Sequence, residues 1–304
     1  MAVPALGLLV RYRRDLHAAR ARLDAVDRHA VSTPWGAVEY AERGAGEPVL
    51  VVHGIFQNCV SGLISVRDLL AGRRLIAPSR FGYLGSSMPP DATPAAQADA
   101  FAALLDALDI RSIDVVAVSA GATSALQLAL RHPDRVKHLA VLVGNLPGSP
   151  TAVVQPRWTK RSGRQFVMWA LWTLVPSVMV RMVAAVPESF VMSPDDVRNV
   201  DELIDSMFPM SREGFNFDLF VSNADVNSCA LEQISVPTLI AHTNDDQLAS
   251  HEASRRAAER IPGARFVSLD SGGHLMLGQQ KKGRDALADF FAGAKDRAAE
   301  PVAS

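Results

Sequence analysis

Over residues 1–27, apolar side chains recur at every third or fourth position, which predicts an amphipathic N-terminal helix. Its apolar face would consist of Leu9, Tyr12, Leu16, Ala19, Leu23 and Val26. Most of the remaining surface of this helix would carry the arginines Arg11, Arg13, Arg14, Arg20 and Arg22. A basic amphipathic helix can pack on the body of the protein or lie on an anionic membrane surface, and the pattern leaves both interpretations open.

From residue 28 onward the pattern changes to that of strands and helices. Residues Ala37–Glu42 alternate between apolar and polar, and turn residues separate them from the apolar run Pro48–Val52. This predicts two antiparallel strands that lead into the first buried one. Strands and helices then alternate over Leu75–Pro78, Pro94–Leu108, Ile113–Val118, Ala120–His132 and Val136–Val143. Such alternation builds a mostly parallel central sheet flanked by helices, so the predicted fold class is α/β.

The alternation stops at residue 145, and the following segment has a helical pattern up to residue 234. Within it, Ser193-Pro194 followed by two aspartates predicts a helix start. Strand signals return at Pro237–Ala241 and Arg265–Leu269, with helices near Glu252–Ile261 and Arg284–Phe291. We therefore predict an N-terminal helix (1–27), an α/β core (28–144 and 235–294), a helical cap or lid (145–234) and a polar tail (295–304).

Composition narrows the class of protein. The 304 residues are 48% hydrophobic, enough for a large core, and a net charge of −1 gives no field that would attract nucleic acid. Cys59 and Cys229 are the only cysteines, which favours free thiols and a cytoplasmic location, although one disulfide between them is the alternative.

The arginines near the N-terminus follow the apolar run instead of preceding it, unlike those of a secretory signal. Residues 166–180 carry no charge but contain Pro176, which favours a buried or interfacial segment over a membrane span.

One serine occupies a position typical of a nucleophile. Residues 117–121 read Ala-Val-Ser-Ala-Gly and lie between the predicted strand Ile113–Val118 and the predicted helix Ala120–His132. A strand, a sharp turn and a helix lift the hydroxyl at the corner clear of the backbone. Ser119 is therefore the first candidate for a catalytic residue.

Several other motifs accompany this serine. They are His53-Gly54 after a strand, Asp246 after a later strand, Gly272-Gly273-His274 after the last strand, and the segments SRFGYLGS (79–86) and VPTLIAHTNDD (236–246). Together with the AVSAG turn they resemble the α/β-hydrolase family over about residues 28–293, in a branch with an inserted helical cap. The resemblance implies a serine hydrolase that works without a cofactor or a metal ion.

The resemblance also assigns roles to three side chains. A serine hydroxyl needs a base to remove its proton, and the base needs a third group to hold its tautomer. Ser119, His274 and Asp246 match these roles in the chain order that the family uses. Asp245 is adjacent and is the alternative acid; Asp246 is preferred because Thr243 occupies the glycine of the family's Gly-x-x-Asp pattern. Ala117 departs from the usual glycine before the serine.

Backbone N–H groups are expected to stabilise the charge that develops on the substrate oxygen. The resemblance places them at Ala120, where a helix begins, and at Ile55 after His53-Gly54, with Phe56 as the alternative to Ile55. In the loop 79–86, Arg80 and Tyr83 are expected to support the loop structure, Arg80 through an internal ion pair, with a place at the pocket entrance as the alternative.

The cap sequence is rich in large apolar residues, which predicts an acyl-binding pocket lined by Phe56, Trp169 and Trp172, or simple packing of the cap on the body. Arg157, Lys160, Arg161 and Arg164 precede this stretch and allow peripheral membrane contact. The function that fits best is hydrolysis of a carboxylic ester with a hydrophobic acyl group, a small-molecule substrate. Thioester, lactone or amide substrates, acyl transfer to another alcohol, and a non-catalytic binding protein of the same fold are the alternatives.

Overall fold

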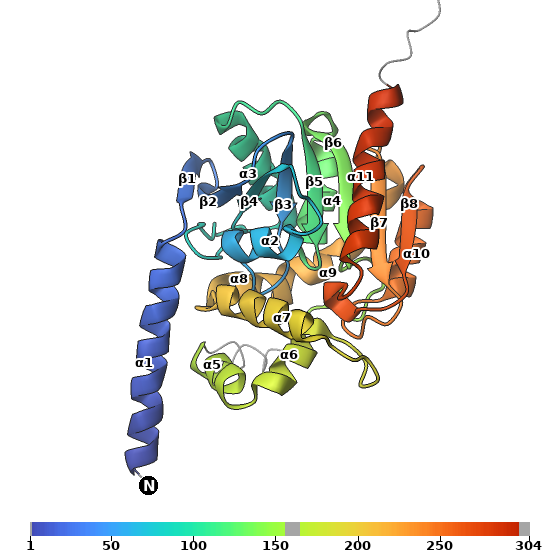
Figure 1. Cartoon of the computed structure of the whole chain (residues 1–304). Coiled ribbons are helices and arrows are strands. Elements are labelled where there is room, and N and C mark those ends of the chain that lie inside the picture. The colour runs from blue at the N-terminus through green and yellow to red at the C-terminus, as the bar shows by residue number, and fades with distance from the viewer. Residues whose placement is uncertain (1, 156–164, 298–304) are drawn as a thin grey trace, which may run out of the picture.

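An eight-stranded sheet forms the centre of the protein in the computed structural model, which describes residues 2–155 and 165–297 (Figure 1). Strand order is β1-β2-β4-β3-β5-β6-β7-β8. Both pairings of β2, with β1 and with β4, are antiparallel, and all pairings from β4 to β8 are parallel. The predicted mostly parallel α/β sheet is thus confirmed. The strands are β1 (Arg28–Thr33), β2 (Gly36–Arg43), β3 (Pro48–Val52), β4 (Arg74–Pro78), β5 (Ile113–Val118), β6 (Val136–Leu142), β7 (Thr238–Thr243) and β8 (Arg265–Leu269).

Helices cover both faces of the sheet because the central strands are apolar on both sides. Along β3, Leu50 and Val52 belong to a core cluster with α3 (Pro94–Ala107), α4 (Gly121–Arg131) and α10 (His251–Arg260). Val49 and Val51 point to the opposite face, where they pack with α2 (Cys59–Val66) and α11 (Gln280–Arg297). The two clusters fix the strand ends on which the candidate site is built.

The segment between β6 and β7 contains the helices that we call the cap. They are α5 (Gln165–Leu174), α6 (Pro176–Ala184), α7 (Pro194–Met207), α8 (Arg212–Phe217), the π-helical segment η3 (Asp218–Ser222) and the short α9 (Asn223–Asp225). Ser193 caps α7 as predicted, with its side chain accepting a hydrogen bond from the N–H of Asp196. Contacts of α7 with α2 and of α6 with the turn at residues 273–275 seat the cap beside the carboxyl ends of the strands.

The N-terminal helix α1 (Ala2–Asp24) packs on the cap, where it contacts α5 and α7 (Figure 1). Ala19 is buried against Trp169 and Phe208 of the cap. At the other end of the chain, α11 runs to Arg297 and so includes the first three residues of the predicted polar tail. The rest of that tail, residues 298–304, and the basic cluster at residues 157–164 lie outside the described residues.

The apolar stretch near residue 170 forms two helices instead of one, because Pro176 starts a second helix. α5 and α6 meet at 109°. In the described part of the chain, no single helix is long and apolar enough to cross a membrane, although this bent pair meets the criteria of length and composition. Cys59 and Cys229 are free and buried, and burial raises the pKa of each thiol to about 12.

Candidate active site

Ser119 lies on a sharp turn between β5 and α4 with φ of +53°, a left-handed backbone conformation that is strained for serine. Its N–H donates to Leu142 O, and its carbonyl accepts from the N–H groups of Ala122 and Asn145. At Gly121 a Cβ would lie 2.3 Å from Val52 O, so only glycine lets α4 begin this close to β3. These contacts hold the Ser119 side chain at the carboxyl edge of the sheet.

His274 reaches Ser119 from the loop after β8. Its Nε2 lies 2.7 Å from Ser119 Oγ, and its side chain is almost fully buried. The two preceding glycines have positive φ, +115° at Gly272 and +58° at Gly273. A Cβ at Gly273 would lie 2.3 Å from Ala184 O of the cap, so the loop needs glycine to pass beneath α6. The imidazole is therefore presented to the serine by a tightly packed loop.

Of the two adjacent acids, Asp246 contacts the imidazole. Its Oδ2 lies 2.7 Å from His274 Nδ1, and its Oδ1 accepts from the N–H groups of Leu248 and Ala249. The Asp245 carboxylate instead accepts from the N–H groups of Gly272 and Gly273 and so holds the histidine loop. Burial alone would raise the pKa of Asp246, but the charge of His274 and hydrogen bonds from surrounding donors bring it well below the ordinary value.

A second histidine, which the sequence analysis did not single out, contacts the same carboxylate oxygen. His242 is fully buried on β7, and its Nε2 lies 3.0 Å from Asp246 Oδ2. Its Nδ1 lies 2.7 Å from Ser254 Oγ. Because an ionised carboxylate only accepts hydrogen bonds, Nε2 carries the proton and Nδ1 accepts from the Ser254 hydroxyl. Asp246 thus receives four donors, two on each oxygen, and His242 fixes its orientation.

Replacing His242 tests this positioning role. In His242→Leu, Asp246 Oδ2 loses one donor and binds the charged form of His274 more strongly, so the acid limb of the kcat/KM profile moves to higher pH. Loss of a hydrogen bond to a charged group costs about 1.5–3 kcal/mol of unfolding free energy, so the variant is also expected to be less stable. His242→Gln keeps an N–H donor and is expected to retain the native limb. Identical pH profiles for native protein and His242→Leu would contradict the role.

Two backbone N–H groups belong to residues that line the cavity at Ser119. Those of Ile55 and Ala120 have no acceptor among the described residues, and both residues line the same cavity as Ser119. The N–H of Phe56, the alternative to Ile55, donates to the Tyr83 hydroxyl at 3.3 Å. Of these three candidates, Ile55 and Ala120 therefore keep an N–H group without an acceptor among the described residues.

A buried ion pair braces the loop that carries Ile55. Arg80 and Asp218 are fully buried, and their two hydrogen bonds are both 2.6 Å long. Tyr83 donates to the same carboxylate at 2.5 Å, and Arg80 also donates to Gly54 O at 3.2 Å. Arg80 thus forms the internal ion pair expected from the sequence, and neither Arg80 nor Tyr83 lines the Ser119 cavity. Asp218 belongs to the cap, so the network joins the cap to this loop.

Removing one charge of this pair is expected to destabilise the fold. Asp218→Asn leaves Arg80 buried without a counter-charge, which costs about 3–5 kcal/mol of unfolding free energy. Glu42→Gln is the matched control, because the Glu42–Arg74 pair is partly exposed and contributes about 0–1 kcal/mol. Urea unfolding of both variants measures the difference; equal losses would show that the buried pair contributes no more than the surface one.

The cavity at Ser119 has a volume of about 310 Å³. Apolar side chains form much of its wall, with Phe56 stacked on Phe215 at 4.7 Å between ring centroids. Phe56 thus lines the cavity that contains Ser119. Trp169 and Trp172 do not line this cavity; they line another one between α1 and the cap, because their face of α5 turns toward α1. The lining residues are Ile55, Phe56, Ser119, Ala120, Asn145, Thr151, Gln155, Phe215, Leu219, Asn223, Leu248, Ala249 and His274.

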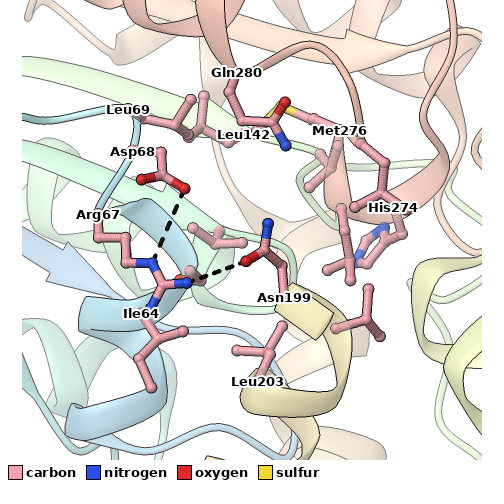
Figure 2. Close-up of a pocket in the computed structure, with 16 residues that line it drawn as sticks. Ile64, Arg67, Asp68, Leu69, Leu142, Asn199, Leu203, His274, Met276 and Gln280 are labelled. Atoms are coloured by element: carbon pink, nitrogen blue, oxygen red, sulfur yellow. Dashed lines mark hydrogen bonds and ion pairs between the residues drawn. The ribbon is translucent and has the colours of Figure 1, made fainter. Parts of the chain in front are cut away.

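A second hollow also has His274 in its wall (Figure 2). It measures only about 80 Å³ and runs between α2, α7 and the His274 loop. Arg67 crosses its rim, where it contacts Asn199 and Asp68 and binds Glu202 through both carboxylate oxygens. Its size is below the usual range of ligand pockets, so the larger cavity at Ser119 is the candidate substrate site.

Comparison with known proteins adds family information to this geometry. The model of the family described as the alpha/beta hydrolase fold matches residues 47–279. The uncharacterized hydrolase YcgS of Bacillus subtilis (strain 168) is 28% identical over 271 residues, which cover 81% of this chain and 91% of that protein. The 2-hydroxymuconate semialdehyde hydrolase of Pseudomonas putida is 29% identical over 247 residues, covering 77% and 82%. A solved alpha/beta hydrolase fold protein from Nakamurella multipartita superposes with a TM-score of 0.70 at 28% identity, covering 87% of this chain and 98% of that one.

Proposed function

This chain belongs to the alpha/beta hydrolase family and is a hydrolase, and we propose that it cleaves a carboxylic ester through an acyl-enzyme formed on Ser119. The observation that carries the proposal is the hydrogen-bonded series Ser119–His274–Asp246, with 2.7 Å at each of its two contacts. This series opens into a cavity that also contains two N–H groups without acceptors among the described residues.

Each group has a defined part in the proposed reaction. His274 Nε2 removes the proton of Ser119 Oγ as that oxygen attacks the ester carbonyl carbon, and Asp246 holds the Nδ1–H tautomer and stabilises the imidazolium. The N–H groups of Ile55 and Ala120 donate to the negatively charged oxygen of the tetrahedral intermediate. His274 then protonates the leaving alcohol, and a water molecule activated by the same imidazole releases the acid. An alcohol in place of water would give acyl transfer.

The walls of the cavity favour a hydrophobic acyl group. Phe56, Phe215, Leu219 and Leu248 offer apolar surface beside the serine, and burial of each methylene of an acyl chain contributes about 0.8 kcal/mol. A series of nitrophenyl esters from acetate upward tests this directly. We expect kcat/KM to rise with chain length until the cavity is filled and then to fall. The absence of hydrolysis across the series would sink the ester proposal, and a preference for acetate would sink the hydrophobic acyl group.

Activity is expected to fall as the pH is lowered, because protonated His274 cannot accept the serine proton. The lowered pKa of Asp246 has a separate consequence: its carboxylate stays ionised through this range. The Asp246 carboxylate contributes to stability at pH values above the pKa that it has in the unfolded chain. This contribution is lost only as the pH falls towards its lower pKa in the folded protein. The loss of activity should therefore follow one ionisation without unfolding. Measurements of kcat/KM from about pH 5 to pH 9, with circular dichroism at each pH, check this; a flat profile would contradict it.

A further inference from the structure

The outer sides of α5 and α6 expose large apolar residues. We define the α5–α6 apolar face by Phe166, Val167, Leu171, Leu174, Val178 and Met182. Leu174 and Val178 are each 60% exposed, and Met182 is 55% exposed. Single exposed apolar residues are ordinary on protein surfaces, but a group of this size on two consecutive helices indicates an interaction site.

On each of the two helices, exposed and buried apolar residues lie on different sides. Val167, Leu171 and Leu174 follow each other at helical spacing, whereas Trp169 on the other side of α5 is buried. On α6, Val178 and Met182 are exposed while Val180 is buried in the cap core. The bend of 109° between the helices suits a pair that lies in an interface more than one that spans a bilayer.

The N-terminal helix extends this surface. Tyr12 of α1 packs edge-on against Phe166, with ring centroids 5.1 Å apart, and donates a hydrogen bond to Gln165. One turn before Tyr12, Leu9 and Val10 are exposed. Figure 1 shows α5, α6 and the first part of α1 at the end of the molecule farthest from the sheet. The apolar surface therefore continues from the cap onto α1.

Positive charge accompanies the apolar surface on α1. Arg11, Arg13 and Arg14 directly follow Val10, and all three are exposed. Arg11 and Arg14 share one acidic partner, Asp15, and Arg13 has no acidic partner within the described ranges. Three arginines against one aspartate leave an excess of positive charge at the edge of an apolar surface. Anionic lipid headgroups above an apolar bilayer interior are complementary to both properties.

We propose that α1 and the α5–α6 apolar face dock the protein on the surface of an anionic membrane. The apolar side chains enter the boundary between headgroups and acyl chains, and the arginines of α1 contact the headgroups. A second copy of the chain is a poorer occupant, because a two-fold dimer through this surface would bring two sets of the same arginines to one interface. Docking does not require turnover by Ser119, so it stands apart from the proposed activity.

Sedimentation of the full chain with lipid vesicles tests the proposal. The protein is expected to sediment with vesicles of phosphatidylcholine and phosphatidylglycerol, much less with pure phosphatidylcholine, and less again at high salt. Leu174→Ser with Val178→Ser should reduce the bound fraction about tenfold or more, and Arg13→Glu should reduce it severalfold. Arg265→Glu makes the same charge change at an exposed position of edge strand β8 and should bind like the native chain.

Leu174 and Val178 line no part of the Ser119 cavity. Hydrolysis of a soluble ester and an unchanged melting temperature therefore show that the double variant is folded. Native protein that stays in the supernatant with both vesicle types would overturn the proposal. Light scattering after gel filtration adds a second decisive result. A native dimer that Leu174→Ser with Val178→Ser converts to a monomer would assign the face to self-association instead.

Discussion

Ser119→Ala is expected to lower kcat for ester hydrolysis by a factor on the order of 10⁵ to 10⁶. Alanine keeps the small side chain that the strained turn accepts but has no oxygen to carry the acyl group. His274, Asp246 and the N–H groups of Ile55 and Ala120 remain in place, so the residual rate should still exceed that of uncatalysed hydrolysis. Substrate binding is expected to change little, because the substitution removes only one hydroxyl from the cavity wall.

Two measurements check the role of Ser119. Initial rates with the best nitrophenyl ester give kcat, and mass spectrometry after treatment with a fluorophosphonate shows whether residue 119 is labelled. Ser124→Ala is a matched control, because Ser124 is fully buried on α4 and its hydroxyl has no partner among the described residues. It should keep near-native activity and labelling. An unlabelled native protein, or hydrolysis by Ser119→Ala at the native rate, would contradict a covalent mechanism on this serine.

Local patterns in the sequence predict the elements of the fold well because each depends on its own residues. The apolar run Ile113–Val118 is buried along its whole length as β5, and the capping serine at residue 193 begins α7. Strand order does not follow from such local patterns, since β2 precedes β3 in the chain but pairs with β4. Nothing in the alternation of residues encodes that pairing, which depends on the path of the connection after β3.

The candidate site shows the same division between local and long-range information. Ser119 and His274 are marked by glycines, because the turn and the loop that present them need backbone conformations or close approaches that other residues resist. His242 carries no such mark and reads as an ordinary strand residue, although it contacts Asp246. The prediction for Trp169 is wrong because the pattern of α5 does not reveal which neighbour each of its faces meets.

Replacement of Asp246, one of two adjacent carboxylates, is expected to have the second-largest effect on kcat. In Asp246→Asn, the amide cannot hold the Nδ1–H tautomer of His274 or stabilise its charged form, so kcat is expected to fall about 10⁴-fold. The structure is expected to survive, because the amide oxygen can still accept from the N–H groups of Leu248 and Ala249, which Oδ1 of Asp246 binds. KM should change much less than kcat, since Asp246 does not line the substrate cavity.

Asp245→Asn separates this electrostatic role from support of the loop. Asp245 accepts from the N–H groups of Gly272 and Gly273, with one carboxylate oxygen for each, and an amide replaces one acceptor by a donor. One loop N–H then loses its partner, which costs about 1–3 kcal/mol of stability. We expect a lower melting temperature and a kcat within about tenfold of native. A greater loss of kcat in Asp245→Asn than in Asp246→Asn would reassign the acid to Asp245, because only the residue that holds the imidazolium charge can affect the chemical step so strongly.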